Sequence, residues 1–253
     1  MLEVKNIMKG FGGLQAVYDC SLDVQEGSIT GLIGPNGAGK TTLFNLITGF
    51  FKPDSGEIYF NGERIDGLRP NQIFHKKIYR TFQITREFAQ MTILENLMVV
   101  PALQAGERIW NTWVRPGTVR QQEKAIKEKA LHVLEFVELI DLKDEYAGSL
   151  SGGQKKLLEL ARSMMAEPKM VLLDEPGAGV NPTLMNKLVD NIRKLCEQEG
   201  ITFFLIEHDM NLVMNLCAPV IVMSGGRKLA EGTPEDIKRD DRVLAAYLGG
   251  QYR

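Results

Sequence analysis

The sequence has 253 residues, of which 44% are hydrophobic and 25% are charged, as expected of one globular domain or of a domain with a subdomain. Thirty Lys and Arg residues against 32 Asp and Glu leave a formal net charge of -2, which gives no general electrostatic reason to expect a nucleic-acid partner. Three scattered cysteines are too few for a disulfide framework or a zinc site, and they predict a chain of the reducing cytoplasm.

The first predicted elements are a strand, a loop and a helix. SITGLIG at 28–34 is a short apolar run that ends in glycine, and KTTLFNLIT at 40–48 follows it with helical spacing. The segment 56–65 then alternates around Asn61 and Gly62, a strong two-residue hairpin signal. We therefore expect antiparallel strands beside a parallel core.

The rest of the chain predicts a helical insertion within an α/β pattern. Residues 90–165 are rich in helical spacing without a strong strand, and WNTWVRPGTV at 110–119 within them is expected to be an irregular connection. MVLLD at 170–174 and ITFFLI at 201–206 are predicted to be buried parallel strands, and both fall far short of the ~20 residues that span a bilayer. The predicted helix between these strands has one apolar face, made of Leu184, Leu188, Ile192 and Leu195.

A phosphate-binding pattern lies between the first strand and helix. The motif G-x-x-x-x-G-K-[ST] is present with Gly34, Gly39, Lys40 and Thr41. Glycines let the backbone curl so that its N–H groups point at phosphate oxygens, and the helix start adds the positive end of its dipole. Lys40 is expected at the β and γ phosphates, and the Thr41 hydroxyl at Mg²⁺. The alternative is a chance glycine turn, which the flanking strand and helix make rarer.

Acidic and imidazole side chains follow two of the later strands. Asp174 ends MVLLD, where a P-loop site needs a carboxylate for the metal's outer shell, and Glu175 is placed to orient or deprotonate the attacking water. His208 comes after the next strand, at the edge where parallel sheets gather their ligands, and could contact the γ-phosphate. The alternatives are an ordinary acidic pair and a structural histidine, and His75 and His132 are interpreted as structural.

A second glycine-rich stretch, LSGGQ at 150–154, is also at a predicted helix start. Ser151 is placed to cap that helix, and the stretch has no lysine of its own. With this segment, the chain resembles the nucleotide-binding subunit of an ATP-binding cassette (ABC) transporter over nearly its whole length. In that family the P-loop of each subunit faces the signature segment of the other, so that two ATP molecules are sandwiched. A plain capped turn is the alternative.

The resemblance implies an α/β P-loop NTPase fold, with a RecA-like parallel core sheet, an antiparallel β subdomain and an ABC-specific helical subdomain. It makes 1–253 a single ABC ATPase domain. The core nucleotide-binding subdomain is expected in 1–89 and 166–253, and the helical subdomain with the signature motif in 90–165.

The resemblance also assigns the site residues. Catalytic roles fall on Glu175, His208 and the Q-loop Gln83, and Mg²⁺ contacts on Thr41, Gln83 and Asp174. The implied ATP contacts are Phe11, Gly34, Pro35, Asn36, Gly37, Ala38, Gly39, Lys40, Thr41, Thr42, Ser151, Gly152, Gly153 and Gln154.

Two positions depart from the commonest family pattern. Phe11 would stack on adenine where tyrosine is more usual, and a phenylalanine after a first strand is often a core residue instead. Asn181 in GAGVNP stands where the D-loop usually has aspartate, which leaves the contacts of that loop with a partner open.

Within the family the chain looks most like the branched-chain amino-acid importer ATPases. The segments that carry this resemblance are RTFQ, MTILENLMV, GAGVNP, EGTPEDI and LAAYLGG. The implied partners are integral membrane permease subunits, whose cytoplasmic helix is received by residues 83–99, and a second ABC ATPase subunit, of the same or a different chain, in a head-to-tail dimer. No nucleic acid and no direct contact with the transported substrate are implied. The expected location is the cytoplasm, peripheral on the inner face of the cell membrane.

Three alternatives remain at this point. The lipopolysaccharide-export ATPases are similar over the AGV loop and the YLG ending, and a soluble ABC ATPase not tied to transport, such as one of cluster assembly, also remains open. A GTPase would need a guanine-recognition motif, for which NKLVD at 186–190 is a poor match because its aspartate comes one residue late.

Overall fold

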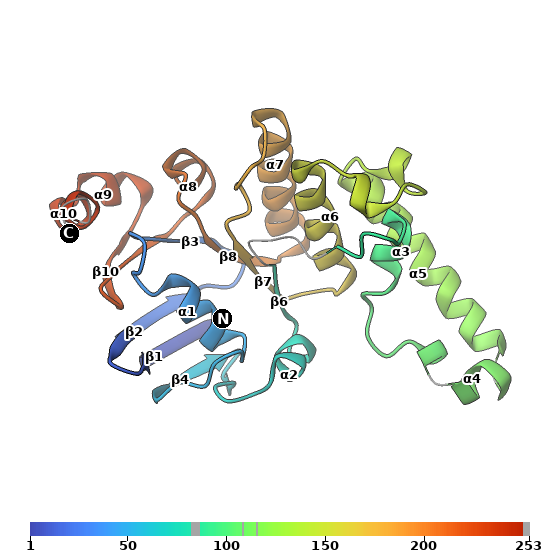
Figure 1. Cartoon of the computed structure of the whole chain (residues 1–253), viewed down its shortest axis with the longest axis horizontal. Coiled ribbons are helices and arrows are strands. Elements are labelled where there is room, and N and C mark those ends of the chain that lie inside the picture. The colour runs from blue at the N-terminus through green and yellow to red at the C-terminus, as the bar shows by residue number, and fades with distance from the viewer. Residues whose placement is uncertain (82–86, 108, 115, 250–253) are drawn as a thin grey trace. The chain divides into compact units, whose positions relative to one another are not determined.

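A computed structural model describes residues 1–81, 87–107, 109–114 and 116–249. The chain divides into two compact units (Figure 1). The core unit consists of Met1–Gln83, Lys169–Ala178 and Ile192–Arg253, and the helical unit consists of Ile84–Pro168 and Gly179–Asn191. The subdomain boundaries drawn from the sequence stay a prediction about how the chain is organised.

A six-stranded, mainly parallel sheet forms the centre of the core unit. Its strands lie in the order β10-β9-β3-β8-β7-β6, and β10 alone among these six is antiparallel to its neighbour. The strands are β3 (Ile29–Ile33), β6 (Ile78–Arg80), β7 (Met170–Asp174), β8 (Thr202–Ile206), β9 (Val220–Ser224) and β10 (Arg227–Gly232). Every residue of β7 and β8 is buried, as expected of parallel strands covered on both faces, so both strand predictions are confirmed.

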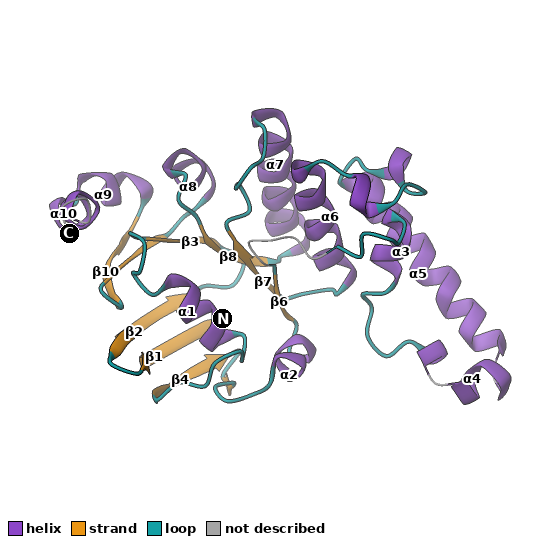
Figure 2. Ribbon diagram, in the orientation of Figure 1, coloured by secondary structure: helices purple, strands orange, loops and turns teal. Residues whose placement is uncertain are grey.

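A separate four-stranded antiparallel sheet has the order β2-β1-β4-β5 (Figure 2). Its strands are β1 (Leu2–Phe11), β2 (Leu14–Val24), β4 (Ser55–Phe60) and β5 (Glu63–Arg64). Asn61 and Gly62 join β4 to β5 with φ of 51° and 78°, the two positive values that a tight hairpin turn requires. The hairpin predicted there is confirmed.

The helices of the core unit are α1 (Lys40–Ile47), α2 (Pro70–His75), α8 (Met210–Leu216), α9 (Pro234–Arg239) and α10 (Asp241–Gly249). Helix α1 lies in one hydrophobic cluster with residues from both sheets. Within it, the rings of Phe44 and Phe204 have centroids 5.1 Å apart, and both side chains are fully buried. The helix that carries Lys40 is thereby fixed to the sheet strand that precedes His208.

The helical unit contains no strand among its described residues, and a single bridge pairs Thr92 with Tyr146. Its elements are α3 (Ile93–Met98), η1 (Ala105–Glu107), α4 (Ile109–Val114), α5 (Pro116–Phe136), η2 (Ile140–Leu142), η3 (Ala147–Ser149) and α6 (Gly152–Met165). The irregular connection predicted at 110–119 is wrong, because the described residues of this stretch belong to α4 and to the start of α5. Pro116 is the first residue of α5, where its missing N–H is no loss to the helix.

Helix α7 (Pro182–Glu199) contributes residues to both units. Leu188, Ile192 and Leu195 are buried, so the predicted apolar face is confirmed, and the NKLVD stretch lies inside this helix. In the described part of the chain, no helix combines the length and the apolar character that crossing a membrane requires.

Candidate nucleotide site

Two glycines allow the loop between β3 and α1 to lie directly against neighbouring strands. Gly34 has φ of 150°, and a Cβ atom there would lie 2.1 Å from the Met223 carbonyl oxygen. Gly39 has φ of 99°, and its Cβ would lie 2.4 Å from the Ala16 carbonyl oxygen. Any larger residue would push the loop away from both contacts, so the spacing of these two glycines is a packing requirement.

Lys40 is held by the loop that precedes it. Its Nζ donates hydrogen bonds to the carbonyl oxygens of Gly34, at 2.7 Å, and Pro35, at 3.1 Å. The residue is 6% exposed, and burial lowers the pKa of Lys40, while Glu175 and Asp174 act in the opposite direction. The Lys40 ammonium group is thus bound by two neutral carbonyl oxygens. An anionic phosphate oxygen would form a stronger hydrogen bond with it than either carbonyl oxygen does.

The first turn of α1 points its backbone N–H groups toward the same space. Gly39 is the N-cap and gives no side-chain hydrogen bond, and this turn contains no acidic residue. A helix N-terminus without its own cap, with a lysine at its first position, has the chemistry that binds an anion.

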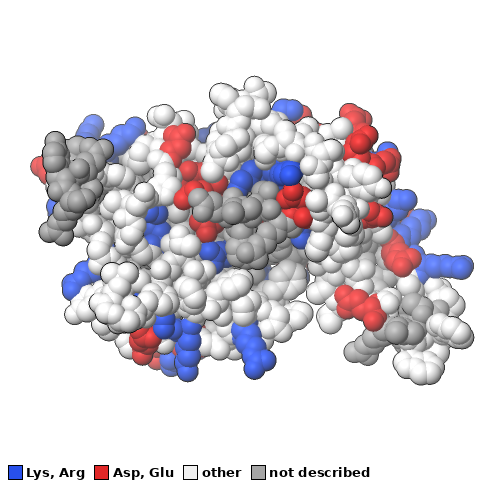
Figure 3. All heavy atoms as spheres, viewed as in Figure 1, with Lys and Arg blue, Asp and Glu red and all other residues white. Residues whose placement is uncertain are grey.

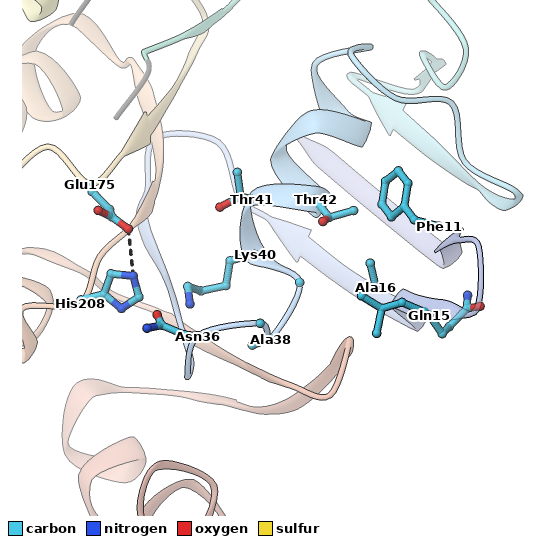
Figure 4. A pocket seen from close by; sticks show the side chains of 13 residues that line it. Phe11, Gln15, Ala16, Asn36, Ala38, Lys40, Thr41, Thr42, Glu175 and His208 are labelled. Carbon is cyan, nitrogen blue, oxygen red and sulfur yellow. Dashed lines mark ion pairs between the residues drawn. The ribbon is translucent and has the colours of Figure 1, made fainter. Parts of the chain in front are cut away.

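A cavity of about 330 Å³ opens over this loop. It is lined by Phe11, Leu14, Gln15, Ala16, Asn36, Gly37, Ala38, Gly39, Lys40, Thr41, Thr42, Glu175 and His208. Figure 4 shows Glu175 and His208 at one end of the cavity and Phe11 at the other, with Lys40 and Thr41 between them. The cavity is therefore polar and charged at one end and aromatic at the other, and this order fits a nucleoside triphosphate.

Phe11, at the last position of β1, is not a core residue. Its ring is 43% exposed and contacts the ring of Phe51 edge-on, with centroids 5.1 Å apart. The Lys9 ammonium lies over the Phe11 ring, 5.5 Å from its centroid. An exposed aromatic face held by such neighbours is a platform on which a base can stack.

Glu175 and His208 meet at the carboxyl ends of two neighbouring parallel strands. The imidazole Nε2 of His208 lies 2.9 Å from Oε1 of Glu175. Glu175 has a left-handed backbone, with φ of 50°, and its N–H donates to the carbonyl oxygen of Ile206 at 3.0 Å. Strained backbone that is fixed by neighbouring contacts often marks a functional position.

Asp174 is buried beside the cavity rather than lining it, and it makes an ion pair that the sequence did not predict. Arg80 Nη2 lies 2.9 Å from Asp174 Oδ2, and Arg80 Nη1 donates to Asn45 Oδ1 at 2.6 Å and to Thr48 Oγ1 at 3.1 Å. Burial lowers the pKa of Arg80, and its hydrogen bond to Asp174 opposes this effect. The pair depends on the pairing of β6 with β7, which sets Arg80 opposite Leu172.

The predicted Q-loop residue, Gln83, lies outside the described residues. The four signature residues belong to the helical unit, at the start of α6. Ser151 is the N-cap: its Oγ accepts from Gln154 N at 3.4 Å, and Gln154 Oε1 accepts from Ser151 N at 2.9 Å. Ser151 and Gly152 are exposed, whereas Gly153 is buried and a Cβ there would lie 2.5 Å from Leu184 Cδ1.

Asn181, at the departure from the usual D-loop, caps α7. Its Oδ1 accepts from Leu184 N at 3.0 Å, and its carbonyl oxygen accepts from Met185 N at 2.9 Å. An asparagine serves this role as well as an aspartate, so the substitution keeps the start of the helix intact.

Comparison with known proteins agrees with this geometry. Residues 17–178 match the family described as "ABC transporter". The chain belongs to this family of ATP-binding cassettes. As an ABC cassette it binds nucleotide and is an ATPase, and the predicted P-loop NTPase fold is confirmed.

Several relatives resemble the cassette over nearly its full length. The high-affinity branched-chain amino acid transport ATP-binding protein BraF of Pseudomonas aeruginosa is 43% identical over 249 residues, which cover 98% of each chain. The probable branched-chain amino acid transport ATP-binding protein LivG of Archaeoglobus fulgidus is 41% identical over 251 residues, 99% of this chain and 96% of the relative. The crystal structure of a nucleotide-free ATP-binding cassette from an ABC transporter is 40% identical, with a TM-score of 0.84 and 98% of each chain covered.

The C-terminal part of the cassette has a match of its own. Residues 227–253 match a family described as "Branched-chain amino acid ATP-binding cassette transporter". In this region burial raises the pKa of Tyr247, and a hydrogen bond with the backbone of Gly34 acts in the opposite direction.

The Arg80–Asp174 pair gives a stability prediction. Arg80→Met should lower the free energy of unfolding by about 3 to 5 kcal/mol, because Asp174 is left as a buried charge without its cation. Adding Asp174→Asn should recover part of the loss, and denaturant titration of both variants measures the two effects. Arg64→Met is the matched control, since the Arg64 side chain is 53% exposed where it pairs with Glu57 and Asp66, and its loss should be much smaller. Equal losses for the two arginines would contradict the prediction.

Proposed function

We propose that ATP lies along the cavity with adenine on Phe11, the phosphates on the P-loop and the γ-phosphate at Glu175 and His208. The observation that carries this proposal is the order of groups along the cavity, with an aromatic face, a buried ammonium and a carboxylate–imidazole pair in sequence (Figure 4). This order matches the order of base, phosphates and scissile bond in ATP.

The site residues then divide the chemistry of hydrolysis among them. Glu175 orients the attacking water and accepts its proton, and His208 fixes the Glu175 carboxylate and contacts the γ-phosphate. Lys40 and the N–H groups of α1 stabilise the charge that develops on the phosphate oxygens. Among the described residues, Thr41 lines the cavity and would hold Mg²⁺, and Asp174, buried beside the cavity, would bind the outer shell of the ion. Mg²⁺ neutralises phosphate charge when bound.

The signature segment supplies the other half of a second site, in a head-to-tail dimer. Ser151 and Gly152 are exposed at the start of a helix, where the hydroxyl and the backbone N–H groups are the groups that recognise phosphate. A solved relative, 25% identical, is described as a dimeric structure of an ATP-binding cassette in a post-hydrolysis state, bound to ADP and Pi. In our proposal ATP joins two cassettes, and its hydrolysis releases them.

The proposed role is to power the import of branched-chain amino acids through separate membrane subunits. The names of the relatives and the match over residues 227–253 support this substrate class. The chain would be peripheral on the inner face of the membrane, and residues 83–99 would receive a permease helix. Basic and acidic side chains are interspersed on the face drawn in Figure 3.

Glu175→Gln tests the assignment of the general base. The variant should bind ATP with unchanged affinity and hydrolyse it about 100- to 10,000-fold more slowly, because the amide cannot accept a proton. Titration calorimetry measures the affinity, and phosphate release measures the rate. Lys40→Ala is the contrasting variant and should lose nucleotide binding. Hydrolysis at the parental rate in Glu175→Gln would remove Glu175 from its role.

Ser151→Arg tests the clamp. A bulky cation at the exposed start of α6 should block ATP-dependent dimerisation while leaving ATP affinity of the monomer unchanged, because Lys40 and the P-loop lie elsewhere in the chain. Sedimentation of the Glu175→Gln background with and without Ser151→Arg measures dimer formation. Dimers of normal stability in the double variant would contradict the clamp.

A transport assay tests the substrate class. Cells whose sole copy of this cassette carries Glu175→Gln should lose uptake of labelled leucine, isoleucine and valine, and keep uptake of an unrelated amino acid. The variant should still co-purify with its membrane subunits, since the change leaves the docking surface intact. Normal leucine uptake together with a defect in lipopolysaccharide export, or recovery of the chain without any membrane subunit, would overturn the proposed role.

A further inference from the structure

Glu207, the residue before His208, is almost fully buried yet carries a carboxylate. It is 4% exposed and lies directly after β8. The pairing of β7 with β8 sets Asp174 opposite Ile206, so the residues that follow the two strands, Glu175 and Glu207, leave the sheet side by side. A buried carboxylate at this place needs hydrogen-bond donors, and its donors come from both loops.

Both oxygens of the Glu207 carboxylate accept backbone hydrogen bonds. Oε1 accepts from Gly177 N at 2.7 Å, in the loop that follows Glu175. Oε2 accepts from His208 N at 2.9 Å and from Asp209 N at 3.4 Å, in the loop that carries the imidazole. One side chain therefore binds the main chain of the two loops whose side chains meet at 2.9 Å in the Glu175–His208 pair.

We infer that Glu207 is a positioning residue for ATP hydrolysis, which holds the loops of Glu175 and His208 in register so that the general base stays aligned. This inference rests on the proposed roles of Glu175 and His208. Glu207 does not line the cavity, and it acts through the backbone of its neighbours. A carboxylate suits this task because both of its oxygens accept, so one group serves donors on opposite sides.

Glutamine cannot replace it in this geometry. The amide has one accepting oxygen and one donating nitrogen, so one of the two loops loses its acceptor and faces a second donor. The change in volume is small and the fold should persist. Small displacements of a positioned base reduce the rate strongly, whereas the contacts that bind ATP on the P-loop are made by other residues.

The experiment measures the full chain with MgATP, in parallel for binding and for hydrolysis. In Glu207→Gln, kcat should fall by about 10- to 100-fold while ATP affinity changes by less than about threefold, since a positioning group acts on the chemical step. Rates are compared well below the unfolding temperature of each variant. A parental kcat in Glu207→Gln, with Glu175→Gln inactive, overturns the inference alone; a parental kcat in both overturns the proposed site itself.

Thr202→Val is the matched control for a merely structural role. Thr202 is fully buried at the first position of β8, the strand that precedes Glu207, and its Oγ1 accepts from Gly27 N at 2.9 Å, away from the cavity. This variant also removes the acceptor of a backbone N–H and should lower the unfolding temperature, yet it should keep the parental kcat. If Thr202→Val lowers kcat as much as Glu207→Gln does, the effect is one of general stability and the inference fails.

A double variant separates positioning from an independent effect. In the His208→Ala background the pair that Glu207 aligns is absent, so Glu207→Gln should cost a much smaller factor in kcat than it does in the parental chain. If the fall in kcat of the double variant equals the product of the two single-variant factors, Glu207 acts independently of His208, which contradicts the inference.

Discussion

The hydrogen bonds between the Lys40 ammonium and the carbonyl oxygens of its own loop are the interaction on which the site depends. They require the loop to curl back over the first turn of α1, and this curl exists only because Gly34 and Gly39 approach neighbouring carbonyl oxygens more closely than any Cβ permits. The loop therefore takes its shape from packing contacts within its own chain. A pre-shaped cradle binds its anion without first ordering a flexible segment.

The Arg80–Asp174 pair joins the neighbouring strands β6 and β7 of the parallel sheet. A carboxylate that is 5% exposed at the end of a buried strand is costly unless a cation accompanies it, and Arg80 supplies that cation from the adjacent strand. Arg80 is in turn oriented by Asn45 and Thr48 of the P-loop helix region. The buried Asp174 carboxylate is thus paired with a cation that α1 and the residue after it hold in place.

Local patterns were sufficient for part of this structure and insufficient for the rest. The P-loop, the hairpin at Asn61 and the buried strand 170–174 are fixed by residues close together in sequence, and each was predicted. Arg80 escaped prediction because its partner is set by strand pairing across more than ninety positions of the chain. The prediction for 110–119 is wrong because Pro116 is the first residue of α5, and proline is well accommodated at a helix start.

The two glycine-rich helix starts differ in one physical respect that sequence similarity hides. At α6, Ser151 and Gln154 satisfy each other's backbone N–H groups, so two of the N–H groups at this helix start are bound within the chain. At α1, Gly39 provides no side-chain cap, and the first turn is left to bind something else. The uncapped start of α1, with Lys40 at its first position, therefore suits a ligand that this chain binds firmly. The capped and exposed start of α6 suits a surface that contacts a ligand already bound to another chain. A site shared between two chains needs one start of each kind.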